Sequence, residues 1–168
     1  MSKFNFIKQF ALCSIVALFS SYEIGCGFGM NSKEDRLVQA VRRDDVKAIA
    51  KLLREGANIN GQERHMLSET PLVACSATDA TNAFFFLLSN GAGVNVPAHD
   101  GVTPLAQAVT LGDYNLVKVR ELVRRGANVN AVDNHGNSIL RLAKAAGANL
   151  LVDELNSAGA RGGLIIEK

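Results

Sequence analysis

The residues of this chain best suited to chemistry are its three histidines, His65, His99 and His135. Imidazole titrates near neutral pH and is a common zinc ligand. All three fall in connections between repeated segments, and the stretches His99-Asp100-Gly101 and Asn134-His135-Gly136 are typical of turns. If the turns join stacked helices, they lie about 8–10 Å apart, whereas zinc needs ligands at about 2.0–2.1 Å. Successive turns cannot easily converge on one ion, and we expect no metal site.

No pattern in the sequence places a nucleophile beside a base. Nucleophilic catalysis needs a side chain held against a base and an oxyanion site, and the patterns G-x-S-x-G and H-E-x-x-H do not occur. The adjacent carboxylates of Asp44-Asp45 and of Asp153-Glu154 would point in different directions on a helix. We therefore expect no enzyme, no catalytic residue, no cofactor and no small-molecule substrate.

The elements that position these residues begin after an N-terminal segment of a different kind. Lys3 and Lys8 precede an apolar run at residues 10–19, and small polar residues follow it. This order is typical of a secretory signal peptide, whereas a membrane-spanning helix needs about 20 apolar residues. We predict that residues 1–26 direct export. A retained membrane anchor is the alternative.

The end of this segment resembles a bacterial lipoprotein signal. Ile24-Gly25-Cys26 fits such a signal, but Glu23 stands where a leucine-like residue is usual. Two interpretations stay open: lipid is attached to Cys26, or cleavage nearby leaves Cys26 as an ordinary residue. We expect a periplasmic protein or a lipoprotein attached to the outer membrane, with secretion as an alternative. Residues 27–33 are interpreted as a flexible linker.

Charge and cysteine content narrow the range of partners. Removal of residues 1–26 leaves acidic and basic residues nearly balanced, whereas nucleic-acid-binding proteins usually carry a concentrated basic field. We expect no nucleic-acid partner, and we interpret Arg42-Arg43 and Arg124-Arg125 as solvated helix ends that suit the helix dipole. Cys75 lies in an apolar stretch and is expected in the core rather than in a disulfide.

From residue 34 the chain repeats itself. Gly56, Gly91 and Gly126 each end an apolar stretch and recur at intervals of 35 residues, while Thr-Pro-Leu opens such a stretch at Thr70 and Thr103. Threonine is a good helix cap, proline suits the first helical turn and glycine ends a helix. The hydrophobic content of 48% with only 6% aromatic residues favours packed helices. A period of this length indicates a solenoid of helical hairpins.

Thr-Pro-Leu, a Gly or Asp turn, a second helix and a closing Gly-Ala-x-Val-Asn make residues 34–160 resemble the ankyrin repeat family. The resemblance implies an all-α solenoid of about four helix-turn-helix units with β-hairpin-like connecting loops, and a tail at residues 161–168. The first and fourth units lack Thr-Pro-Leu, which fits terminal caps with one uncovered face. The family's usual His after Thr-Pro-Leu is replaced by Val73 and Ala106, and Arg141 stands there in the fourth unit.

Two segments are longer than their counterparts. Gly56 and Thr70 are 14 residues apart where the next two such pairs are 12 apart, and Thr103 and Gly126 are 23 apart where the others are 21 apart. Insertions in solenoids map to loops, often on the binding face. We predict a contact loop at residues 61–67 and place the second insertion around residues 114–116.

In the family the first helices and hairpin tips line a concave, protein-binding surface. The resemblance therefore implies a monomer that binds a partner protein of unknown identity. The residues expected to contact it are Arg64, His65, Met66, His99, Gln107, Leu111, Asn134 and His135. Phe85 is a further candidate because it falls where the repeat usually has a solvated Lys, the alternative being burial by neighbouring repeats.

Two other functions stay open. The protein could be a bacterial effector that acts on a host protein, or a structural or inhibitory protein of the envelope held at a membrane by lipid on Cys26.

Overall fold

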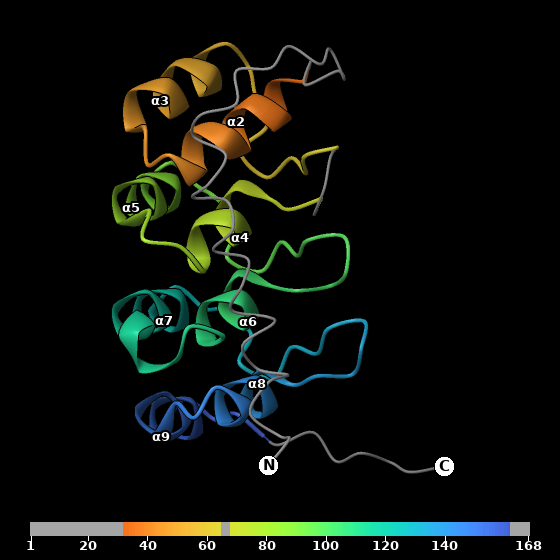
Figure 1. Cartoon of the computed structure of the whole chain (residues 1–168), viewed down its shortest axis with the longest axis vertical. Coiled ribbons are helices and arrows are strands. Elements are labelled where there is room, and N and C mark those ends of the chain that lie inside the picture. The colour runs from red at the N-terminus through yellow and green to blue at the C-terminus, as the bar shows by residue number, and fades with distance from the viewer. Residues whose placement is uncertain (1–31, 65–67, 162–168) are drawn as a thin grey trace, which may run out of the picture.

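Four pairs of helices stack along one axis in the computed structural model, which describes residues 32–64 and 68–161. The first helices of the pairs form one layer, the second helices form another, and the connecting loops project beyond the first layer (Figure 1). The pairs are α2 (Lys33–Arg42) with α3 (Val46–Arg54), α4 (Pro71–Ser76) with α5 (Thr81–Ser89), α6 (Pro104–Val109) with α7 (Leu116–Arg124), and α8 (Ile139–Ala145) with α9 (Asn149–Ser157). A short 3-10 turn, η2 (Gly112–Asn115), precedes α7. The predicted all-α stack of four units is confirmed.

Side-chain caps set the start of three of the first helices, two of them at the predicted threonines. The hydroxyl groups of Thr70, Thr103 and Ser138 each accept a hydrogen bond from a backbone N–H in the first turn of the following helix. Pro71 and Pro104 occupy that first turn, where a missing N–H breaks no hydrogen bond. These caps set the start of each first helix and thus the position of the loop before it.

The core lies between the two helix layers. Leu72 and Leu105 from first helices and Leu87 and Leu122 from second helices are almost completely buried. Cys75 is also buried, as predicted, and burial raises the pKa of its thiol to about 12. The core is continuous along the stack, so each repeat depends on its neighbours for burial of its apolar side chains.

Asparagine side chains link each repeat to the next near the ends of the second helices. The Oδ1 atom of Asn60 accepts a hydrogen bond from Gly93 N at 2.8 Å, and that of Asn95 accepts one from Asn128 N at 2.8 Å. Asn130 continues the series by accepting a hydrogen bond from the backbone N–H of residue 161 at 2.7 Å. The recurring Gly-Ala-x-Val-Asn thus does two things: its glycine ends a helix and its asparagine joins adjacent repeats.

Aspartates between the paired helices also act across repeats. Asp45 caps its own helix α3 by accepting a hydrogen bond from Ala48 N. Asp44 instead accepts a hydrogen bond from Ala83 N in the first turn of α5, and Asp113 accepts one from Leu151 N in α9. Both α5 and α9 lack a side-chain cap of their own. The preceding repeat therefore supplies it.

At the interface between the second and third repeats, the following repeat supplies the capping side chains. Asn115, in the predicted insertion, donates hydrogen bonds to the carbonyl groups of Ser76 and Ala108. The Nζ atom of Lys118 donates to Cys75 O at 2.8 Å and lies 5.4 Å from the centre of the Phe84 ring. Burial lowers the pKa of Lys118, which is only 4% exposed. The third repeat thus caps the carboxyl end of α4.

The connecting loops are hairpin-like, as predicted. Val132 and Ser138 form an isolated antiparallel bridge, and Ala98 N donates to Val102 O at 2.9 Å. Across the residues the structure describes, no helix has the length and apolar character needed to cross a bilayer.

Candidate partner-binding surface

The hairpin tips are held against one another by their backbones. His99 N donates to Ser68 O at 3.3 Å, and Asn134 N donates to Asp100 O at 3.0 Å. The side-chain amide of Asn134 adds a bond to His99 O. Because the backbones make these contacts, the tips are fixed relative to one another while the side chains of His99 and His135 remain exposed.

The last hairpin is also fixed from within. The carboxylate of Asp133 accepts hydrogen bonds from His135 N at 2.9 Å and from Asn137 N at 2.8 Å, and a third from the Asn137 side chain. Although burial alone would raise the pKa of Asp133, these bonds outweigh it and the pKa is lowered. The loop that carries His135 is therefore ordered before any partner is present.

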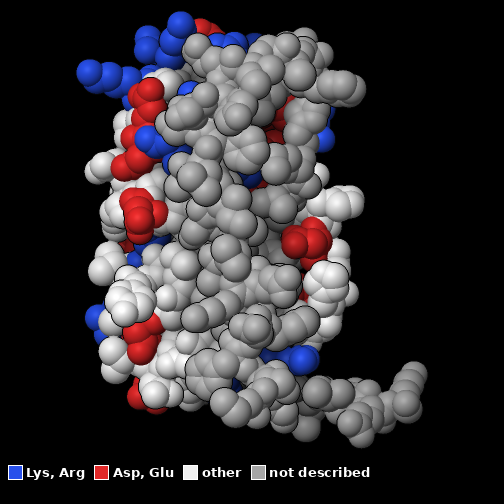
Figure 2. Space-filling model, in the orientation of Figure 1, with Lys and Arg blue, Asp and Glu red and all other residues white. Residues whose placement is uncertain are grey.

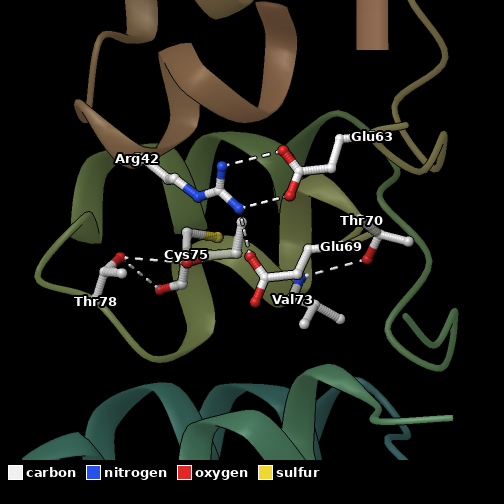
Figure 3. A network of polar contacts seen from close by, with 8 residues as sticks. Arg42, Glu63, Glu69, Thr70, Val73, Cys75 and Thr78 are labelled. Atoms are coloured by element: carbon white, nitrogen blue, oxygen red, sulfur yellow. Dashed lines mark hydrogen bonds and ion pairs between the residues drawn. The ribbon is translucent and has the colours of Figure 1, made fainter. Parts of the chain in front are cut away.

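A charged cluster anchors the first, longer connection. The guanidinium group of Arg42 binds both carboxylate oxygens of Glu63 at 3.0 and 2.6 Å and one oxygen of Glu69 at 2.8 Å. Figure 3 shows Arg42 reaching from its helix to the two carboxylates. Glu63 N also donates to Glu69 O, which closes the base of the loop. The described part of this connection is thus fixed to the first helix at Glu63 and Glu69.

The Arg42 cluster corrects the prediction that this arginine is a solvated helix end. Burial on its own would lower the pKa of Arg42, but the hydrogen bonds and charges of Glu63 and Glu69 outweigh it and the pKa is raised. Burial raises the pKa of Glu69, and Arg42 opposes that rise. The partners of Arg42 lie 21 and 27 residues away. Helix-end patterns in the sequence cannot reveal them.

A second anchor fixes the backbone at Arg64. The carboxylate of Asp35 accepts a hydrogen bond from Arg64 N at 2.7 Å while it also accepts one from Ser32 N at the start of α2. The Arg64 side chain is exposed. Its backbone is thus positioned by the first repeat, and its charge is available to a partner.

The structure brings some of the predicted contact residues together and separates others. Arg64, His99, Asn134 and His135 are exposed on the hairpin side, and Gln107 is partly buried on α6. Leu111 is 41% exposed but lies in the turn after α6, at the opposite end of that helix from the hairpin. His65 and Met66 lie outside the described residues, as does Cys26.

Phe85 lies between the two alternatives considered for it. Its side chain is partly buried and packs against the core. Its ring meets that of Phe84 edge to face, with centroids 5.3 Å apart. Phe85 therefore contributes to packing and leaves only part of its surface to solvent.

Sequence reasoning missed an apolar surface at the turn edge of the third and fourth repeats. Tyr114 is fully exposed, and Val117 and Leu150 are exposed nearby on the second helices. Leu111 and Tyr114 border a shallow cleft of about 460 Å³. The insertion placed around residues 114–116 was the available signal, but a repeat pattern does not say which way an inserted side chain points.

No group of three or more His, Cys, Asp or Glu side chains suited to a metal ion occurs in residues 32–64 and 68–161. The exposed histidines His99 and His135 stand on separate tips, joined to their neighbours through backbone contacts.

Comparison with known proteins matches the repeated part of the chain. The sequence model of a family described as ankyrin repeats (3 copies) matches residues 37–133 and, again, residues 72–161. Human neurogenic locus notch homolog protein 2 is 35% identical over 125 residues, which is 71% of this chain and 5% of that protein. Xenopus laevis neurogenic locus notch homolog protein 1 is 36% identical over 128 residues, 73% of this chain and 5% of that protein. The putative E3 ubiquitin-protein ligase XBAT34 of Arabidopsis thaliana is 33% identical over 129 residues, 75% of this chain and 33% of that protein. The chain therefore spans a third or less of the length of these relatives.

Proposed function

The chain belongs to the ankyrin repeat family, and from that premise we propose that it is an exported scaffold that binds a partner protein through the hairpin side of its stack. Ankyrin repeats generally mediate protein–protein interaction. The observation that carries the proposal is the order of the tips: the backbones at His99 and Asn134 are hydrogen-bonded to the preceding hairpins, and the side chains at these tips are exposed.

Such a surface suits binding because little has to be ordered when the partner arrives. Ordering loops and side chains is one of the main costs of association, and a preformed surface reduces it. The Arg42 cluster and the hydrogen bond from Arg64 N to Asp35 hold the first connection in place in the same way. The specificity of the scaffold then lies in side chains that differ from tip to tip, namely those of Arg64, His99 and His135.

Export and membrane attachment complete the proposal. The basic start and the apolar run within residues 1–26 support export, and the Ile24-Gly25-Cys26 sequence supports lipid attachment at Cys26. We place the scaffold in the periplasm or at the outer membrane, with secretion as the alternative. The partner is then a protein of that compartment.

Replacement of the three tip residues tests the binding surface. We expect Arg64→Ala, His99→Ala and His135→Ala together to lower the affinity for a captured envelope protein at least about tenfold, because removal of a few central contacts commonly costs more than 1 kcal/mol each. Quantitative capture from the envelope fraction measures the loss.

A matched control changes three exposed residues of the last helix pair: Lys144→Ala, Asn149→Ala and Asn156→Ala. This variant should retain wild-type capture. Equal retention of a partner by the tip variant would contradict the proposed surface, provided that thermal unfolding shows both variants to be folded.

A further inference from the structure

The first repeat presents a concentrated basic surface at one end of the stack. Figure 2 shows Lys and Arg side chains gathered over the end formed by α2 and α3. Among the acidic residues of 33–56, Asp45 and Glu55 are exposed, Glu34 and Asp44 are partly exposed, and Asp35 is buried. The exposed basic residues of the same stretch are Lys33, Arg36, Arg43, Lys47, Lys51 and Arg54. The near-neutral total charge of the chain conceals this local excess.

Internal contacts use little of this charge. Lys33 donates to a backbone carbonyl, that of Glu55, and the Lys51–Glu55 ion pair is long, at 3.8 Å. Asp45 is engaged as the cap of α3. Arg42, by contrast, is the arginine of this repeat that two carboxylates neutralise. Arg54 donates to the carbonyl group of Ala50 in its own helix, and among the described residues no carboxylate forms an ion pair with Arg36, Arg43 or Lys47.

The basic surface has a definite place in the repeat pattern. Arg36 is exposed at a position that is buried in the next three repeats, where Pro71, Pro104 and Ile139 stand. Lys47, Lys51 and Arg54 follow one another at helical spacing and share one face of α3. The next second helix, α5, contains no charged residue. The surface therefore does not continue onto α5, and it lies at the end of the stack that follows residues 1–31.

We propose that this basic end docks on the surface of an anionic phospholipid bilayer. The proposal rests on the attachment through Cys26 proposed above. Cys26 precedes the α2 cap Ser32 by six residues, which span at most about 20 Å when extended. A lipid on Cys26 would thus hold α2 and α3 near the lipid headgroups, where each basic residue strengthens binding about fivefold.

Two features favour a bilayer over nucleic acid. Residues 32–64 contain no aromatic side chain on which a base could stack, whereas proteins that bind single strands commonly use such platforms. A lipid anchor combined with a basic surface is also a common means of membrane binding. Docking by this end leaves the hairpin tips free for a protein partner, because the loops project sideways from the stack (Figure 1).

Vesicle flotation of the protein purified from its envelope, in the form that export leaves, tests the proposal. The probes are phosphatidylcholine vesicles with and without phosphatidylglycerol, at low and at high salt. We expect tighter binding to the anionic vesicles, weakened by salt because counterions screen exposed charges. The triple reversal Lys47→Glu, Lys51→Glu and Arg54→Glu should weaken binding to anionic vesicles at least about tenfold.

The matched control reverses three exposed basic residues at the other end of the stack: Arg141→Glu, Lys144→Glu and Arg161→Glu. Both variants change the net charge equally, so an equal loss of binding would contradict a docking end and indicate a general charge effect. Binding that ignores the anionic lipid would also overturn the proposal. If the first reversal impairs folding, Lys47→Gln, Lys51→Gln and Arg54→Gln replace it with the same expected direction.

A Cys26→Ser variant separates this proposal from lipid attachment. If lipid is attached, Cys26→Ser should lose binding to neutral vesicles. If Cys26→Ser and wild type bind neutral vesicles equally, lipid attachment fails, while the preference of both proteins for anionic vesicles still decides whether the basic end docks. A preference for an acidic protein or nucleic acid over anionic vesicles would contradict the proposal.

Discussion

Arg42→Ala is expected to lower the free energy of unfolding by about 2–3 kcal/mol, because removal of one partner from a buried ion pair leaves the other charge uncompensated. Glu63 is only 5% exposed and would lose both bonds to the guanidinium group. Glu69 would lose its bond as well. Urea unfolding followed by circular dichroism measures the change.

The neighbouring Arg43→Ala is the matched control. Arg43 is exposed, and an exposed substitution of this kind usually changes stability by no more than about 0.5 kcal/mol. A variant with Arg42→Met, Glu63→Gln and Glu69→Gln should recover much of the loss, because no buried charge is left unpaired. A loss of the same size in Arg42→Ala and Arg43→Ala would refute the role of the cluster.

The loss in Arg42→Ala should also depend on pH. Burial already raises the pKa of Glu69 in the folded protein above its ordinary 4.5, and loss of Arg42 removes an opposing contribution. A carboxyl group with a higher pKa in the folded state binds more protons there, so folding becomes more favourable as the pH falls. The deficit of Arg42→Ala should therefore shrink as the pH falls toward 4.5.

Leu105→Ala is expected to destabilise the protein by about 3 kcal/mol, since deletion of a buried leucine side chain typically costs about 2–5 kcal/mol. Leu105 is completely buried in α6, within the core shared along the stack. The helix containing it packs between α4 and α8. The cavity would thus weaken both neighbouring interfaces, and thermal and urea unfolding should show the loss.

Leu111→Ala supplies the control for Leu105→Ala. Leu111 follows α6 but is exposed, so its truncation should change stability by less than about 0.5 kcal/mol. If the two leucine variants unfold at the same urea concentration, the division between core and surface described above is wrong. If Leu111→Ala is as stable as the wild type, any effect of this variant on partner capture reports binding at the turn edge rather than folding.

Features that depend on neighbouring residues could be predicted from the sequence. Thr70 and Thr103 cap helices because their hydroxyl groups reach an N–H three residues on, and the closing glycines adopt left-handed dihedrals at φ near +86°. Cys75 could be placed in the core because its neighbours are apolar. The turns that carry His99 and His135 could be predicted because Gly, Asn and Asp stand beside these histidines in the sequence.

Features that join distant repeats could not be read in the same way. Asp44 caps a helix whose donating N–H is 39 positions away, and Lys118 donates to carbonyl groups 40 and 43 positions away. Charge and turn patterns in the sequence do not show which residues of distant repeats meet. The basic surface of the first repeat could not be predicted either, because the sequence does not show which basic residues are neutralised. Arg42 and Arg43 are adjacent, but of these two it is Arg42 that carboxylates neutralise.

Site-specific photo-crosslinking tests the proposed protein-binding surface most directly. A photoreactive phenylalanine analogue is placed in separate variants at His99, at His135 and, as the control, at Lys144, all of which are exposed. Irradiation in the envelope should yield a light-dependent adduct with one other protein from the two tip positions and none from Lys144. No adduct from either tip, or the same adduct from all three positions, would contradict binding through the hairpin side.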